Sequence, residues 1–139
     1  MSTTDASRVP RSASRIGVKA AKAIRAAIKL AGGREVCFVC QLDAEGMLET
    51  ARVVARGDAT SVLALPGFAE RGEMLVHNHP SGNLEPSNPD LEIAARVFAD
   101  GIGFAIVDND AEQLYVVVEV PNEKAQATLS PDEVEHDLG

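Results

Sequence analysis

The sequence predicts one α/β domain in which a mixed, mostly antiparallel sheet is flanked by helices. Two observations lead to this fold class. Apolar residues recur at three- and four-residue steps in residues 15–31 and again in residues 87–100, a spacing typical of amphipathic helices. The stretches between and after these segments are short runs of β-forming residues separated by turn residues. A chain of 139 residues, 45% of them hydrophobic, is long enough to bury one such core.

The two ends of the chain lack this pattern. Residues 1–14 are rich in Ser, Thr, Arg and Pro, and we expect them to form a flexible tail. Residues 121–139 are acidic and weakly apolar, which favours an acidic tail or a linker. The folded domain is therefore expected to occupy residues 15–120.

The first helix is expected over residues 15–31, because Ile16, Ile24 and Ile28 share one face while basic residues fall elsewhere. Gly32 and Gly33 end it, since glycine readily adopts the left-handed conformation that follows a helix. Strands are expected at residues 35–43, 47–56, 61–65 and 73–78.

The second helix follows a turn-rich loop, with Ser87 at its N-cap and Gly101 beyond its end. The residues expected on its inner side are Leu91, Ala94, Ala95, Val97 and Phe98. Two further strands, at residues 104–107 and 114–120, flank a polar loop at residues 108–112. This loop lacks the twelve-residue ligand register of a calcium loop, and we interpret it as a solvated turn.

Composition argues against a membrane or secreted protein. No apolar run reaches the 18 or so residues of a membrane helix, and the first residues lack the apolar segment of a signal peptide. We therefore expect a cytoplasmic protein without membrane contact. Cys37 and Cys40 form a C-x-x-C pair, but positions three apart on a strand face opposite sides. They are interpreted as core residues in a reducing compartment.

Charge is distributed unevenly along the chain. Residues 1–34 hold eight of the thirteen basic residues and one acidic residue, whereas residues 35–139 hold five basic and twenty acidic residues. Such a basic segment can contact nucleic acid, an acidic partner or the acidic body of the same chain. A solvated helix face is the simplest of these interpretations.

Residues 77–90 carry the candidate chemistry. His77 and His79 lie two residues apart at the end of a predicted strand, so both imidazoles point to one side. With Asp90 as an anionic third ligand they match a catalytic zinc site, which leaves its fourth position to water. Ser87 and Asp90 also match a capping box at a helix start. The two interpretations are compatible, because a helix start can present both side chains in a fixed place.

The same residues carry a resemblance to a known family. His77-x-His79-Pro80, six residues, Ser87, two residues and Asp90 resembles the signature of the JAMM (MPN-plus, JAB) zinc metalloproteases, and the string His-Asn-His-Pro-Ser-Gly resembles their bacterial branch, which includes RadC-like proteins. The resemblance covers roughly residues 15–120 and implies a JAMM/MPN-like, cytidine-deaminase-like fold. The family also has a glutamate on an upstream strand, for which Glu35 is the candidate.

One departure from the family is visible in the sequence. Only about six residues separate the strand at residues 61–65 from the next strand, whereas RadC-like proteins carry a full helix there. This favours a more compact JAB subgroup over RadC proper.

The resemblance implies a hydrolase of the JAMM isopeptidase type, related to deubiquitinases, that uses Zn²⁺ to cleave amide or isopeptide bonds. In it, His77, His79 and Asp90 are the metal ligands, Glu35 is the general base, and Ser87 stabilises the oxyanion together with zinc. The expected substrate is a protein or peptide conjugate, as of a ubiquitin-like protein. Specificity is expected from a partner or fused domain, for which a helicase or DNA-repair protein is a candidate.

Two other functions remain open. The basic N-terminal segment is compatible with a nucleic-acid-associated accessory module of a DNA-repair or helicase protein. A zinc-bound interaction domain without catalysis is the other alternative, although such a domain requires neither Glu35 nor Ser87.

Overall fold

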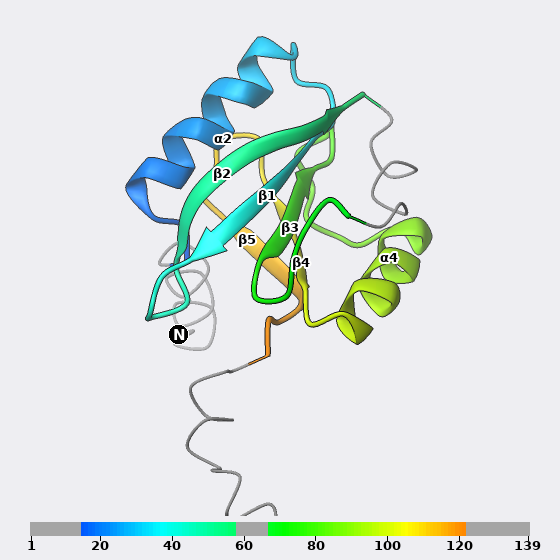
Figure 1. Cartoon of the computed structure of the whole chain (residues 1–139). Coiled ribbons are helices and arrows are strands. Elements are labelled where there is room, and N and C mark those ends of the chain that lie inside the picture. Colours follow the sequence, from blue (N-terminus) through cyan, green and yellow to red (C-terminus); the bar gives the residue numbers. More distant parts are fainter. Residues whose placement is uncertain (1–14, 58–66, 122–139) are drawn as a thin grey trace, which may run out of the picture.

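A computed structural model describes residues 15–57 and 67–121. These residues form a five-stranded sheet with helices on its faces, as predicted (Figure 1). The elements, in chain order, are α2 (Val18–Leu30), β1 (Val36–Leu42), β2 (Leu48–Arg56), β3 (Met74–Asn78), α4 (Asn88–Ala99), β4 (Gly103–Val107) and β5 (Leu114–Val118).

The sheet is mixed, with strand order β2-β1-β3-β4-β5. Its β1–β2, β1–β3 and β4–β5 pairs are antiparallel, and β3–β4 is parallel, with α4 as the crossover between these two strands. The predicted α/β class with a mostly antiparallel sheet is confirmed. Strand β3 lies in the centre of the sheet and all of its residues are buried.

The core consists of two clusters, one on each face of the sheet. On the α2 side, helix residues such as Ile24 and Ile28 pack with Phe38 and Val76, and on the α4 side Ile93 and Val97 pack with strand residues that include Leu75. Cys40 belongs to the first cluster and Cys37 to the second, because successive strand residues face opposite sides. The prediction that these two thiols point apart is confirmed.

Helix α2 begins three residues later than predicted. The preceding segment instead pairs with β2, where the Leu48 N–H donates to Arg15 O (2.7 Å) and the Gly17 N–H donates to Leu48 O (3.0 Å). A Cβ atom at Gly17 would lie 2.7 Å from that Leu48 carbonyl, which explains the glycine. The helix ends as predicted, with Gly32 at a φ of 71° in the left-handed region.

The expectation for the inner face of α4 was wrong in part. Ala94 and Val97 are buried, but Leu91 and Phe98 are 50% and 65% exposed and Ala95 is exposed. The buried stripe runs through Asp90, Ile93, Ala94 and Val97. Since one residue turns a helix by about 100°, Leu91 and Phe98 fall beside this stripe rather than on it.

The predicted strand at residues 61–65, the predicted tail at residues 1–14 and residues 122–139 of the predicted C-terminal tail lie outside the described residues. In the described part of the chain, no helix is long and apolar enough to cross a membrane.

Candidate metal centre

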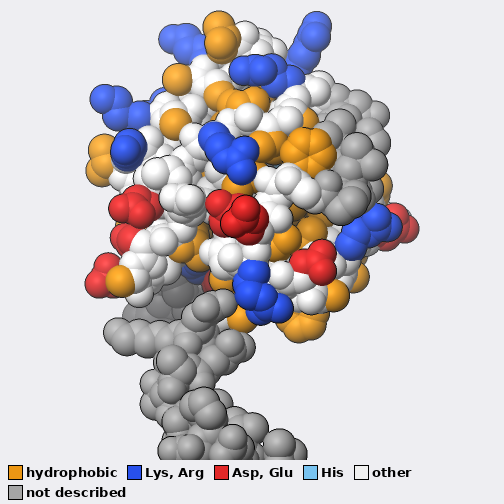
Figure 2. All heavy atoms as spheres, viewed as in Figure 1, with side chains coloured by type: hydrophobic (Ala, Val, Ile, Leu, Met, Phe, Trp, Pro, Cys, Tyr) orange, Lys and Arg blue, Asp and Glu red, His pale blue; other side chains and the backbone are white. Residues whose placement is uncertain are grey.

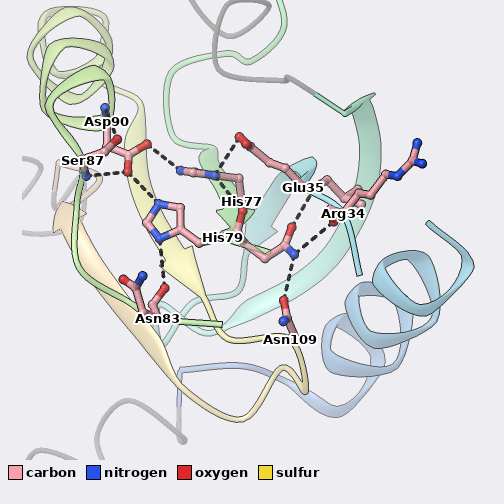
Figure 3. Close-up of polar contacts among 10 residues, drawn as sticks. Arg34, Glu35, His77, His79, Asn83, Ser87, Asp90 and Asn109 are labelled. Atoms are coloured by element: carbon pink, nitrogen blue, oxygen red, sulfur yellow. Dashed lines mark hydrogen bonds and ion pairs between the residues drawn. The ribbon is translucent and has the colours of Figure 1, made fainter. Parts of the chain in front are cut away.

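The topology brings the motif residues together at one end of the central strands, where β3 ends and β1 begins. His77 lies near the end of β3 and His79 just beyond it, and Asp90 lies in the first turn of α4, which packs on the same face. Strand β1 runs antiparallel to β3 with Cys37 opposite His77. Glu35, which precedes β1, therefore lies at the same end of these strands. Figure 3 shows the four side chains converging from three elements.

Both histidines face the carboxylate of Asp90 through Nε2. His77 Nε2 lies 2.7 Å from Asp90 Oδ1, and His79 Nε2 lies 2.9 Å from Oδ2. The three residues form a group whose candidate ligand atoms lie within 4.8 Å of one another. His77 and Asp90 are 1% exposed and His79 is partly buried, so two of the three groups are shielded from bulk water.

The other nitrogen of each imidazole faces a backbone carbonyl. His77 Nδ1 lies 3.1 Å from Asn78 O, and His79 Nδ1 lies 3.0 Å from Asn83 O. A carbonyl only accepts, so these contacts assign the hydrogen to Nδ1 in both rings. Each Nε2 faces the Asp90 carboxylate in the protein without metal. A metal that took the place of these Nε2 contacts would bind the Nε2 lone pairs, because the Nδ1 hydrogens are held by the carbonyls.

Asp90 also forms the predicted capping box. Its Oδ2 accepts from the Ser87 N–H at 2.9 Å, and the Asp90 N–H donates to Ser87 Oγ at 3.3 Å. The capping box and the contacts between Asp90 and the two histidines thus occur together, because the cap holds the carboxylate at the start of the helix. The positive end of the α4 dipole also favours its negative charge.

Electrostatics in the protein without metal follow from these contacts. Burial alone would raise the pKa of Asp90, but hydrogen bonds from His77 and from the Ser87 N–H hold it well below its usual value. Burial alone would lower the pKa of His77, but its contacts with Asp90 and Glu35 raise it to about 9. Without metal, the ionised Asp90 and the protonated His77 therefore stabilise each other.

Glu35 contacts His77 from the other edge of the ring. Its Oε2 lies 3.1 Å from His77 Nδ1, and the side chain is 16% exposed. The structure thus places the glutamate beside the predicted ligands, at the nitrogen that faces away from Asp90. Phe104 stacks on the same imidazole, with ring centroids 5.4 Å apart and an angle of 26° between the planes.

Asn78 was not singled out by the sequence, although it stands between the two histidines. It is 0% exposed, and its side chain contacts Val36 N, Arg34 O and Asn109 Oδ1. The signal for Asn78 was the alternation of side chains along a strand. A residue between two site residues points to the opposite face of the sheet, which α2 covers here. Phe104 had no comparable signal.

Two further groups of candidate ligands occur in the described ranges. Glu35, Cys37 and His77 lie close together, but burial raises the pKa of the Cys37 thiol strongly and keeps it protonated. Asp108, Asp110 and Glu112 form the other group. Asp108 Oδ1 accepts from the Glu112 and Gln113 N–H groups, which agrees with the predicted turn.

The mixed sheet, the flanking helices and the cluster of two histidines and an aspartate agree with a JAB/MPN-like fold. Residues 71–110 match the model of the RadC-like JAB domain. This range contains β3, both histidines, the capping box and β4. The resemblance to the RadC-like branch is confirmed, and the preference for a different, more compact subgroup is not supported, because the matching model is the RadC-like one.

Curated relatives agree with this family. The chain is 33% identical to a UPF0758 protein of Trichormus variabilis over 81 residues, which are 51% of this chain and 33% of the relative. It is 36% identical to a UPF0758 protein of Picosynechococcus over 78 residues, which are 49% of this chain and 32% of the relative. The chain thus spans about a third of the length of these curated relatives.

Proposed function

We propose that this chain is a zinc-dependent hydrolase of amide or isopeptide bonds. The observation that carries the proposal is the meeting of both histidine Nε2 atoms with one carboxylate, while both Nδ1 atoms face backbone carbonyls. Two neutral imidazoles and a carboxylate are the donor set of many catalytic zinc sites. The residues present therefore fit zinc, with His77, His79 and Asp90 as its ligands.

Zinc bound there would supply Lewis acidity and lower the pKa of a water molecule from 15.7 toward about 7. Glu35 is the chain's candidate for moving the proton. It would take a proton from the attacking water and give it to the leaving amine, a role worth roughly 10² to 10⁴ in rate. Its carboxylate borders the ligands but faces His77 Nδ1, so the base role requires its side chain to turn toward the reacting water.

Ser87 has the chemistry to stabilise the oxyanion of amide hydrolysis. Its oxygen accepts from the Asp90 N–H, which leaves the hydroxyl hydrogen as a donor, and the residue is exposed at the helix start. The loss of one such donor in other hydrolases costs about 2.7 to 4 kcal/mol of transition-state stabilisation.

We infer that the substrate is a protein or peptide conjugate. The support is the family match, and the loop between the histidines and the helix, residues 80–86, is short. Specificity is therefore expected to depend on a partner or fused domain. The isolated chain should cleave eukaryotic ubiquitin chains weakly or not at all, and rapid cleavage of such chains would contradict this expectation.

A fluorogenic peptide ending in Gly-Gly-aminomethylcoumarin tests the activity directly. The zinc-loaded protein should release the fluorophore, and EDTA should abolish the release until zinc is restored. Asp90→Ala should be inactive under all conditions. A wild-type protein that binds zinc but releases no fluorophore, and cleaves no lysine-linked conjugate of a ubiquitin-like protein, would contradict the hydrolase proposal and favour the non-catalytic interaction domain.

A nucleic-acid contact is the second candidate, and one observation favours it. Helix α2 buries Ala20, Ile24 and Ile28 but exposes its basic residues, and Figure 2 shows basic side chains gathered over this helix. The exposed basic residues of α2 are Lys19, Lys22, Arg25 and Lys29.

Removal of α2 is an unsuitable test because the helix contributes to the core. Charge reversal of Lys19, Lys22 and Lys29 to Glu leaves the buried face intact. If this surface binds DNA, affinity should fall steeply with salt and disappear in the triple variant. Binding that is equal in both proteins, or absent in both, would remove this candidate.

A further inference from the structure

We propose that Asn78 positions Glu35 for its role in the site. The inference rests on the proposed function, since it assigns a positioning residue to that site. It is carried by three hydrogen bonds of one buried amide, none of which involves the candidate metal ligands' side chains.

The amide of Asn78 holds the backbone on both sides of Glu35. Its Oδ1 accepts from the Val36 N–H at 2.7 Å, and its Nδ2 donates to Arg34 O at 3.2 Å (Figure 3). The Glu35 carbonyl itself accepts from the Gly57 N–H at 2.9 Å. The glutamate is therefore presented by a backbone segment that is fixed before, at and after it.

These contacts stand where the backbone pairing of β1 and β3 stops. The antiparallel ladder runs from Cys40 opposite Met74 to Cys37 opposite His77. Continuation of this register would pair the backbones of Val36 and Asn78. Instead, the side-chain Oδ1 of Asn78 accepts from the Val36 N–H. The amide thus connects the two strands where Glu35 bends toward the His77 imidazole.

A third contact uses the second hydrogen of the Asn78 amide, whose orientation the Val36 N–H donor and the Arg34 O acceptor already set. Asn78 Nδ2 also donates to Asn109 Oδ1 at 2.8 Å, and Asn109 Nδ2 donates to Pro80 O at 3.1 Å. Both hydrogens of the Asn78 amide are therefore used, and its oxygen faces the one N–H donor. An aspartate could not donate to Arg34 O or Asn109 Oδ1, and a glutamine would be one methylene too long.

The arrangement separates the two functions of Asn78. Its backbone carbonyl faces His77 Nδ1, whereas its side chain fixes the Glu35 segment. Replacement of the side chain should therefore leave the zinc ligands in place and release Glu35. A misplacement of about 1 Å in a catalytic group can cost on the order of 10² in rate.

The test uses Asn78→Ser, with Asn109→Ala as the matched control. The control removes one partner of the amide but keeps both contacts to the Glu35 segment. Zinc affinity should be unchanged in both variants, as measured by competition with a chromophoric chelator. With the Gly-Gly-aminomethylcoumarin peptide, kcat should fall about 100-fold in Asn78→Ser, at nearly constant KM, and stay near wild type in Asn109→Ala. In a Glu35→Gln background, Asn78→Ser should cause no further loss.

A second readout does not depend on activity. In NMR spectra of the zinc-loaded protein, the His77 Nδ1 hydrogen and the Val36 amide hydrogen should exchange with water faster in Asn78→Ser and at wild-type rates in Asn109→Ala. If the serine variant does not fold, Asn78→Gln serves as the second variant and should show the same two changes. Unchanged exchange, loss of zinc, or a loss of activity that adds to that of Glu35→Gln would overturn the proposal. Wild-type protein that binds zinc without cleaving the peptide contradicts the hydrolase function only, because the exchange rates still decide the role of Asn78.

Discussion

Glu35 contacts His77 from the side of the imidazole opposite to Asp90. Its Oε2 lies 3.1 Å from Nδ1, while Asp90 Oδ1 lies 2.7 Å from Nε2. A carboxylate at the distal nitrogen of a metal-binding histidine fixes the ring and raises its basicity. In the proposed site, Glu35 would therefore have two roles: it would orient a ligand in the resting state and move a proton during the reaction.

These two roles of Glu35 can be separated by two substitutions. Glu35→Gln keeps an oxygen that accepts from Nδ1, so zinc affinity should stay near that of the wild type. Glu35→Ala removes the acceptor, and zinc affinity should fall about 10- to 100-fold. Both variants should lose roughly 10² to 10⁴ in kcat, because neither can carry a proton. The zinc dissociation constants and the peptide assay provide the comparison, and wild-type kcat in Glu35→Gln would remove the proposed base.

In the proposed site, Ser87 would likewise combine a structural role with a chemical one, and substitutions by glycine and by alanine distinguish the two. As an N-cap, Ser→Ala should cost about 0.5 to 2 kcal/mol of unfolding free energy, whereas glycine costs only a few tenths. Both variants lack the hydroxyl, so both should lose about 10² to 10³ in kcat. Urea unfolding and the peptide assay measure the two effects. If kcat falls in Ser87→Ala but stays near wild type in Ser87→Gly, the serine acts only as the helix cap.

The two cysteines should be inert in the folded protein. Burial, followed by the charge of Glu73, raises the pKa of Cys40 from 9.0 to about 12, and burial also raises the pKa of Cys37. A folded-state pKa that is raised favours the native state fully below about pH 9, and this contribution is lost as the pH rises from 9 toward 12.

At pH 8, a thiol-specific chromogenic disulfide should therefore react with neither cysteine in native protein and with both in urea. The unfolding midpoint should also decline above pH 9, and Cys40→Ala should show a shallower decline. Rapid labelling of native protein would show that the thiols are accessible and would contradict their place in the core.

The sequence predicted the local geometry of the candidate site better than the contacts around it. The two-residue spacing of His77 and His79 on a strand and the Ser87–Asp90 capping box are local patterns, and local patterns determine local geometry. The approach of Glu35 to His77 depends on the pairing of β1 with β3, which only the family resemblance anticipated. The stacking of Phe104 depends on the β3–β4 register, for which the sequence has no local signal.

The fold shows the same limit. Periodicity predicted both helices, but it could not tell that residues 15–17 pair with Leu48 instead of extending α2. Periodicity also predicted too wide a buried face for α4, because Leu91 and Phe98 are apolar yet exposed. Hydrophobic spacing shows which residues can be buried, and only the packing of α4 on the sheet selects the ones that are.

In the proposed function, His77, His79 and Asp90 together hold one zinc ion. The most direct measurement is the zinc content of the purified full chain by elemental analysis, beside Asp90→Asn, which can still cap α4 but lacks the charge. About one zinc per chain is expected in the wild type and in Glu35→Gln, and a large loss is expected in Asp90→Asn. Wild-type protein that takes up no zinc at neutral pH when the metal is supplied would contradict this assignment, and would leave Ser87 and Asp90 as a helix cap only.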